Sequence, residues 1–214
     1  MESTALKWFE DNKFAACIRS SSPSDAESMI KAAIDGGFRM FEISLNTPQA
    51  FRLIESYSKK ESLLIGAGTV SDGEAAQKAI NAGASFISSN YTDRDIINVA
   101  RHNDTFVIQG VATATEASVA HHYGADCVKF FPAAFIGGTD YLRALRDNLP
   151  YVKFVAEGGI DQVNAFEYAK YCLGVFFDKA LYDRHLVRQN NWSEITERAK
   201  RLTQKLESSL KVAK

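Results

Sequence analysis

The chain has 214 residues, of which 46% are hydrophobic, and its formal net charge is −1. That length suits one larger domain or two small ones, and the hydrophobic content is enough for a buried core. Because the sequence holds no large basic block, we expect no nucleic-acid partner. No apolar run is long enough to span a membrane or to form the core of a signal peptide, so we expect a cytoplasmic protein that does not bind membranes.

Cysteine and histidine do not group in the sequence as metal ligands do. Cys17, Cys127 and Cys172 are scattered among strand-like runs, which indicates buried free thiols and not a disulfide framework. The four histidines have no cysteine or carboxylate neighbours at metal-ligand spacing. The sequence therefore predicts neither a metal site nor a cofactor.

Short apolar runs alternate with segments of helical character. The predicted strands are 14–18, 38–43, 63–65, 85–88, 106–108, 127–131, 152–155 and 173–177. The predicted helices between them are 24–35, 47–59, 72–82, 92–103, 115–123, 139–148 and 161–169. A short helix over 1–11 and a long polar helix over 192–210 flank this series. Ser24 and Glu27 have the spacing of a capping box at the start of their helix.

The spacing of these elements, roughly twenty to twenty-six residues per strand and helix, is that of βα units with parallel strands. Eight units predict an α/β fold, a single (β/α)8 TIM barrel over residues 1–214 with an added N-terminal and C-terminal helix. A doubly wound open sheet is the alternative, and it would carry a glycine-rich nucleotide fingerprint after its first strand. Residues 19–23 contain no glycine.

Lys129 lies in the middle of a short apolar strand, 127–131, that Pro132 ends. If both faces of the strand are buried, desolvation penalises the ammonium form and lowers the lysine pKa. A free amine of that kind attacks ketones to form a Schiff base. The alternative is a lysine at a strand end whose ammonium group reaches water.

Function in a barrel lies at the carboxyl-terminal ends of the strands, where polar groups of both signs converge. We expect Glu42 and Lys129 to lie deeper than the rest of this rim. A buried Glu42 is costly unless it is paired or used, and a Glu42–Lys129 ion pair would account for both residues without any chemistry. In the other interpretation, Glu42 shuttles protons for a Schiff base on Lys129. The other candidate residues at the strand ends are Arg19, Gly68, Thr69, Gly110, Glu157, Gly158, Gly159, Asp178 and Lys179.

At these positions the chain resembles the bacterial class I aldolases that cleave 2-keto-3-deoxy-6-phosphogluconate, 2-keto-3-deoxy-6-phosphogalactonate or 4-hydroxy-2-oxoglutarate. The motifs that carry the resemblance are FEISLNTP at 41–48, IGAGTV at 65–70, GVATATE at 110–116, VKFFPA at 128–133 and EGGI at 157–160. The EISLNTPQ stretch that contains Asn46 and the ATATE stretch at 112–116 look closest to the phosphogalactonate branch, and Arg19 also matches that branch.

The resemblance implies that Lys129 forms the imine with the keto acid and that Glu42 moves protons through a bound water. It also implies that the turn at Gly68 and Thr69 seats the pyruvate carboxylate and that Phe131 packs against the keto acid. Asn46, Gly110 and Pro132 belong to the same motifs, and we expect them to border the substrate. Members of the family are metal-independent and usually form homotrimers.

The sequence departs from the family pattern at two places that bear on the substrate. Glu157 replaces a threonine or valine associated with recognition of the substrate hydroxyl configuration. Asp178 and Lys179 replace a Gly-Ser pair that binds the sugar phosphate. The added carboxylates at the rim would oppose a phosphate, and Lys179 would favour one.

The expected function is that of a Schiff-base lyase, which cleaves a 2-keto-3-deoxy sugar acid, phosphorylated or not, or 4-hydroxy-2-oxoglutarate, to pyruvate and an aldehyde. Two alternatives stay open at this point. One is a catalytically weak barrel that binds an acidic metabolite, and the other is an imine-dependent oxaloacetate decarboxylase. In each case the partner is a small-molecule keto acid or a related acid.

Overall fold

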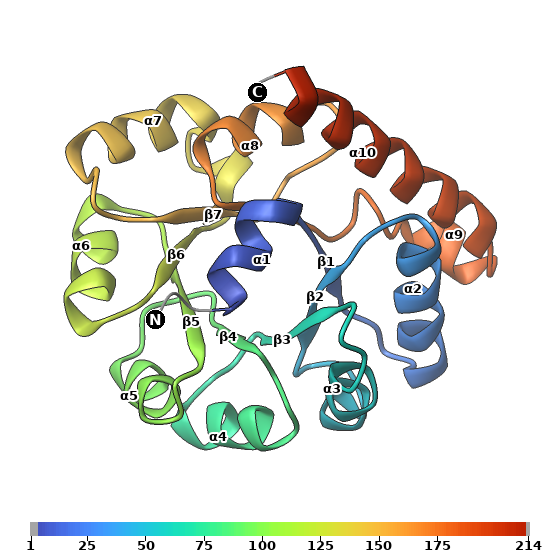
Figure 1. Ribbon diagram of the computed structural model, residues 1–214, viewed down its shortest axis with the longest axis horizontal. Helices are drawn as coiled ribbons and strands as arrows, with labels where there is room; N and C mark the ends of the chain where they lie inside the picture. The colour runs from blue at the N-terminus through green and yellow to red at the C-terminus, as the bar shows by residue number, and fades with distance from the viewer. Residues whose placement is uncertain (1–3, 213–214) are drawn as a thin grey trace.

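The computed structural model describes residues 4–212, which form a closed barrel of eight parallel strands surrounded by helices (Figure 1). Each strand pairs with the next along the chain, and the last pairs with the first. The strands are β1 (Phe14–Ile18), β2 (Met40–Ser44), β3 (Leu64–Gly68), β4 (Phe86–Ser88), β5 (Phe106–Val111), β6 (Cys127–Phe130), β7 (Phe154–Ala156) and β8 (Gly174–Phe177). The predicted TIM barrel is confirmed, and the open sheet is excluded.

The helices follow the predicted alternation. They are α1 (Thr4–Asn12), α2 (Pro23–Asp35), α3 (Ala50–Ser58), α4 (Gly73–Asn81), α5 (Arg94–His102), α6 (Ala114–Tyr123), α7 (Gly138–Asn148), α8 (Ala165–Tyr171), α9 (Arg184–Arg188) and α10 (Trp192–Val212). A 3-10 turn, η1 (Ala133–Phe135), follows β6. The first three residues of the predicted N-terminal helix lie outside the described residues. No helix between residues 4 and 212 is long and apolar enough to cross a membrane.

The N-cap of helix α2 lies two residues before the N-cap of the predicted capping box. Ser22 is its N-cap, and the Ser22 hydroxyl accepts a hydrogen bond from the Asp25 backbone N–H at 3.3 Å. The box predicted at Ser24 and Glu27 is wrong because Pro23 takes the first helical position, where its missing N–H costs nothing.

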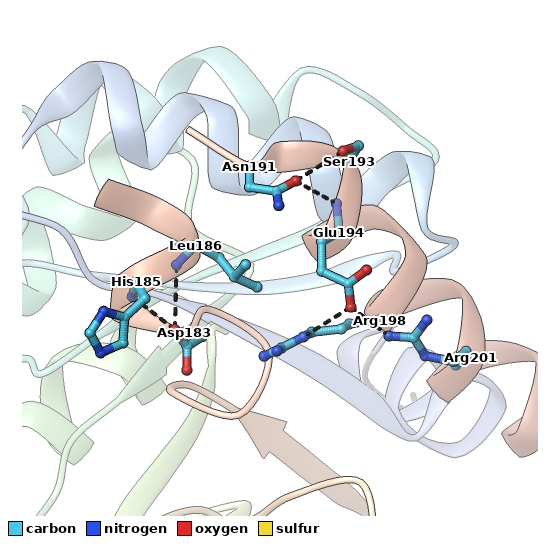
Figure 2. Close-up of polar contacts among 8 residues, drawn as sticks. All are labelled: Asp183, His185, Leu186, Asn191, Ser193, Glu194, Arg198 and Arg201. Atoms are coloured by element: carbon cyan, nitrogen blue, oxygen red, sulfur yellow. Dashed lines mark hydrogen bonds and ion pairs between the residues drawn. The ribbon is translucent and has the colours of Figure 1, made fainter. Parts of the chain in front are cut away.

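Short helix α9 was not predicted, and Figure 2 shows the side chains that begin it and helix α10. Asp183 caps α9, with its carboxylate accepting from the His185 N–H at 2.8 Å. Asn191 accepts from the Glu194 N–H at 3.2 Å, at the start of α10. Glu194 in turn pairs with two arginines further along α10. A five-residue helix held by one cap has too little hydrophobic periodicity to be recognised from sequence.

The long helix α10 packs along α2 on the outside of the barrel (Figure 1). The contact is close at Gly36, where an added Cβ would lie 2.1 Å from the Ala199 Cβ. Thr203 donates a hydrogen bond to the Gly36 carbonyl at 2.8 Å. Helix α10 therefore joins the end of the chain to its first βα unit, as expected for a helix that completes the barrel.

Helix α1 lies across the amino-terminal end of the barrel, over the centre of the ring of strands in Figure 1. Its Phe9 is fully buried, with its ring centroid 5.4 Å from Phe86, 5.7 Å from Phe106 and 5.9 Å from Phe176. Aromatic side chains thus fill this half of the interior, which leaves polar groups to the carboxyl-terminal half.

Candidate active site

Three charged side chains meet inside the carboxyl-terminal half of the barrel. Lys129 lies on β6, Glu42 on β2, and Glu157 directly after β7. Their exposed fractions are 0%, 2% and 2%, so water does not screen them. The Lys129 Nζ donates a hydrogen bond to Glu42 Oε2 at 2.8 Å and lies 2.5 Å from Glu157 Oε2.

The strand register explains how these groups fit inside the barrel. Glu42 lies beside Gly66 of β3, and Lys129 lies beside Gly110 of β5. The next inward position on β3 is Gly68, where an added Cβ would come within 2.2 Å of Glu42 Oε1. The second glycine of the IGAGTV motif, Gly68, is therefore required, since the side chain of any other residue would displace the Glu42 carboxylate.

The pKa of Lys129 is raised, which corrects the sequence-based expectation that burial would lower it. Burial does favour the neutral amine, but the carboxylates of Glu157 and Glu42 together outweigh it. The ammonium also lies over the Phe176 ring, with Nζ 5.3 Å from the ring centroid. Lys129 is therefore an ion-paired ammonium in this state, and a carboxylate within contact distance must take its proton before it can act as a nucleophile.

Burial raises the pKa of Glu42, which is the direction expected for an acid–base group that works near neutrality. The ammonium of Lys129 lowers this pKa and the carboxylate of Glu157 raises it further, with burial the largest effect. The Glu42–Lys129 ion pair considered as the purely structural alternative is present. The pair also places an acid–base group beside the lysine, so its presence fits both interpretations.

Glu157 is not where the sequence led us to expect it. We expected a rim carboxylate that would oppose a phosphate, but its side chain is buried against the Lys129 ammonium. The position falls just beyond the last β7 residue, and the Glu157 N–H still donates to the Phe130 carbonyl at 3.2 Å. This continued pairing extends the inward-outward alternation of β7 by one residue and turns Glu157 inward.

Hydrogen bonds connect three residues at the carboxyl ends of β1, β2 and β3. The Thr69 hydroxyl lies 3.0 Å from the Ser44 hydroxyl and accepts a hydrogen bond from Arg19 Nη2 at 3.2 Å. Thr69 has φ of 56°, a left-handed conformation that is unusual for threonine. A guanidinium and two hydroxyls held together at the rim can bind a carboxylate.

A second group of candidates lies where β6 and β7 end. Phe131 and Pro132 are half-buried, and an added Cβ on Gly158 would lie 2.8 Å from the Pro132 Cα. Gly158 and Gly159 have φ of 94° and 74°, which glycine adopts without strain. The predicted Phe131, Pro132 and Gly158 therefore lie together where β6 and β7 end, and Gly159 lies against Ala134 and Phe135.

The remaining candidates are spread over the rim. Asp178 is half-buried, and burial raises its pKa while Arg19 lowers it and Glu157 raises it further. Lys179 is exposed. Asn46 is also exposed and lines a surface pocket beside Thr69. The glycine at 110 is explained by packing, because an added Cβ would lie 2.0 Å from the Asn90 carbonyl carbon.

Part of the GVATATE motif serves helix α6 instead of the site. The Thr113 hydroxyl accepts from the Glu116 N–H at 3.3 Å, and Glu116 Oε2 accepts from the Thr113 N–H at 2.8 Å. These two residues make the capping box of α6.

Two interior residues were missed by sequence reasoning. Ser44 lies two positions after Glu42, and Cys17 lies two positions before Arg19, so strand alternation alone places them on the inward face. The Cys17 thiol, Glu42 and Glu157 bring three potential ligand atoms within 4.8 Å of one another. The set suits a metal poorly, because Lys129 already pairs with both carboxylates and burial raises the pKa of the thiol well above its usual value.

The chain matches a family model described as KDPG and KHG aldolase over residues 7–198. It is 38% identical to 2-dehydro-3-deoxy-phosphogluconate aldolase of Treponema pallidum (strain Nichols) over 146 residues, 67% of this chain and 69% of the relative. It is 32% identical to 2-dehydro-3-deoxy-6-phosphogalactonate aldolase of Escherichia coli (strain K12) over 183 residues, 83% of this chain and 88% of the relative.

A solved structure similar to this one is that of KDPG aldolase from Legionella pneumophila, with pyruvate captured as a covalent carbinolamine intermediate. The match has a TM-score of 0.85 and 29% sequence identity, and it covers 95% of this chain and 100% of the other. The family suggested by the sequence motifs is thus confirmed: the chain belongs to the KDPG and KHG aldolase family.

Proposed function

We propose that this protein is a Schiff-base aldolase that cleaves a 2-keto-3-deoxy sugar acid or 4-hydroxy-2-oxoglutarate to pyruvate and an aldehyde. The observation that carries the proposal is the buried Lys129 ammonium, held 2.8 Å from a Glu42 carboxylate at the active end of the barrel. One relative named above is a 2-dehydro-3-deoxy-phosphogluconate aldolase and the other is a 2-dehydro-3-deoxy-6-phosphogalactonate aldolase. Both names support a keto sugar acid as the substrate.

The reaction begins when Lys129, freed of one proton, attacks the C2 carbonyl of the keto acid. Loss of water leaves a protonated imine, which acts as an electron sink. Glu42, through a water molecule, takes the proton from the C4 hydroxyl, and the C3–C4 bond breaks to give an enamine and an aldehyde. Protonation of the enamine at C3 and hydrolysis of the imine then release pyruvate and return the lysine.

The substrate carboxylate is proposed to bind at Arg19, Ser44 and the Gly68–Thr69 turn. Arg19 supplies a guanidinium, which pairs with carboxylates in a bidentate geometry. The Thr69 hydroxyl is already within hydrogen-bond distance of both the Ser44 hydroxyl and Arg19. With the carboxylate there, the C2 carbonyl can point toward Lys129, and Phe131 can cover the keto acid.

The remaining site residues are proposed to contact the rest of the substrate. Gly158 and Gly159 face the aldehyde portion, together with Pro132, Asp178 and Lys179. We further propose that residues 1–214 act as one aldolase domain, that the protein works in the cytoplasm without metal or cofactor, and that it forms a homotrimer, as the family resemblance implies.

Trapping the imine tests the proposal. The protein is incubated with pyruvate and borohydride, and the intact mass and the modified peptide are measured. We expect a gain equal to one reduced pyruvate, located on Lys129, and pyruvate release from at least one keto acid of a panel. Trapping without any cleavage would indicate the weak, metabolite-binding barrel, whereas a lack of trapping would overturn the proposed function.

A further inference from the structure

The charged cluster inside the barrel holds one carboxylate more than its charge balance requires. Lys129 is the only Lys, Arg or His in the described part of the chain that forms an ion pair with Glu42 or Glu157. All three side chains are at least 97% buried. A buried carboxylate in excess of its cations destabilises the folded protein, so stabilising the fold does not explain Glu157.

Glu157 lies in an ion-pair contact with the nucleophile, close enough to exchange a proton with it, although no hydrogen bond joins its Oε2 to Lys129 in this arrangement. Its Oε2 is 2.5 Å from Lys129 Nζ, which is closer than Glu42 Oε2 at 2.8 Å. The two carboxylates approach the nitrogen from different strands, Glu157 from the end of the neighbouring β7 and Glu42 from the more distant β2. A nitrogen that contacts two bases can give a proton to one while the other stays available.

We propose that Glu157 is a catalytic base and acid for imine formation, which leaves Glu42 to serve the C4 hydroxyl. This inference rests on the aldolase function proposed above and divides its proton transfers between two carboxylates. Glu157 touches the reacting nitrogen, so its role is in the chemistry and not in positioning Lys129.

The proton transfers assigned to Glu157 balance at each step of imine formation. Glu157 takes one proton from the ammonium, and the amine lone pair bonds to C2 while the carbonyl π electrons move onto oxygen. Glu157 returns the proton to that oxygen, which gives a carbinolamine, and then takes a second proton from the nitrogen. Passing that proton to the carbinolamine hydroxyl expels water and leaves the protonated imine. The cluster has the same charge before and after, because ammonium and protonated imine each carry one positive charge.

The proton exchange takes place among a small number of titratable groups. Those that face Glu157 are Lys129 of β6, Glu42 of β2, Cys17 of β1 and Asp178 after β8. Burial keeps the Cys17 thiol protonated, and Asp178 lies at the rim. Glu42 is the nearest competitor for the same proton, which makes it the matched control.

The test compares Glu157→Gln with Glu42→Gln, two amide replacements beside the same lysine. The rate of imine formation with pyruvate is measured by borohydride quenching and intact mass at a series of pH values, and cleavage is measured separately. We expect Glu157→Gln to slow imine formation by about tenfold or more near neutrality. This deficit should shrink as the pH rises, because hydroxide can then take the ammonium proton. Glu42→Gln should slow cleavage far more than imine formation.

Thermal melting separates this role from a structural one. Because Glu157→Gln removes the surplus buried charge, its Tm should equal or exceed that of the wild type. Glu157→Asp, which keeps a carboxylate, should restore part of the imine rate. The assignment would be overturned if Glu157→Gln formed the imine at the wild-type rate. It would also be overturned if Glu157→Gln had a lowered Tm and both amide variants formed the imine equally slowly. If the wild type traps the imine, the proposed aldolase function stands whatever the Glu157 variants do. If the wild type traps no imine, both the aldolase function and the role of Glu157 are wrong.

Discussion

The two ends of the barrel interior are filled by opposite chemistry. At the amino-terminal end, Phe9 of α1 packs against Phe86, Phe106 and Phe176. At the carboxyl-terminal end, Glu42, Lys129 and Glu157 form a charged cluster that is equally buried. Phe176 touches both regions, because its ring also lies under the Lys129 ammonium.

The difference shows where stability and reactivity come from in this fold. Aromatic side chains in the first region gain free energy by leaving water. Charged groups in the second region lose hydration, and their mutual attraction repays only part of that loss. We therefore expect substitutions at the aromatic end to lower the stability of the fold without changing the catalytic rates. Substitutions at the charged end should lower the catalytic rates, and they should lower the stability less or even raise it.

Lys129→Ala should have the largest effect on activity. Imine trapping and cleavage should fall below detection, because among residues 4–212 no other lysine pairs with the two carboxylates of the cluster. Intact mass after pyruvate and borohydride measures the loss, with wild type as the positive control. Trapping that persists in this variant would mean that Lys129 is not the nucleophile.

The same variant should acquire a pH-dependent stability. Burial already raises the pKa of Glu42, and the Lys129 ammonium lowers it. Removal of the ammonium should therefore raise the pKa of Glu42 further. A carboxyl whose folded pKa is raised stabilises the protein fully below its unfolded pKa, about 4.3, and loses that contribution as the pH rises through the folded pKa. The Tm of Lys129→Ala relative to wild type should therefore fall as the pH rises above the unfolded pKa of the carboxyl. Lys129→Met, which fills more of the space, should show the same trend.

Phe9→Ala should have the largest effect on stability alone. Removal of a fully buried aromatic side chain leaves a cavity and typically costs about 3–5 kcal/mol. Urea unfolding measures the loss, and imine trapping per folded molecule should stay near the wild-type value. Phe9→Leu, which keeps most of the volume, is the matched control and should cost less. A loss of trapping in the folded fraction would show that the two regions are coupled through Phe176.

Glu42→Gln should slow carbon–carbon cleavage by roughly a hundredfold, the scale of one lost acid–base group. Some imine formation should remain, since Glu157 still contacts the lysine. Cleavage is followed by pyruvate release from the keto acid that wild type uses best. Unchanged turnover would remove Glu42 from the mechanism.

The smallest expected effect concerns the phosphate end of the substrate. Because Glu157 lies inside the cluster, the unfavourable charge for a phosphate at the rim comes from Asp178, and the exposed Lys179 offsets part of it. Asp178→Gly with Lys179→Ser should raise the selectivity for a phosphorylated six-carbon keto acid over 4-hydroxy-2-oxoglutarate by about tenfold, or about 1.4 kcal/mol. Lys179→Ser alone is the control. A lower ratio in the double variant would identify Lys179 as a phosphate ligand.

The fold could be predicted almost completely because βα alternation is a local property of the chain. Each strand is a short apolar run and most helices have clear start and stop signals, so the eight units and their order follow from the pattern alone. The errors are the start of α2 and the missed helix α9. The start of α2 depends on whether Pro23 or Ser24 is the first helical residue, and α9 is too short to give a periodic signal.

The sequence by itself determined which residues are chemically unusual: a lysine and a glutamate inside apolar strands, in motifs of a known family. The tertiary structure alone decided their electrostatics. Glu157 is inward because β7 pairing continues past its last residue, and Lys129 is an ammonium because carboxylates 87 and 28 positions away in the sequence meet its nitrogen. A pKa depends on the balance between burial and neighbouring charge, and closure of the barrel sets both at once.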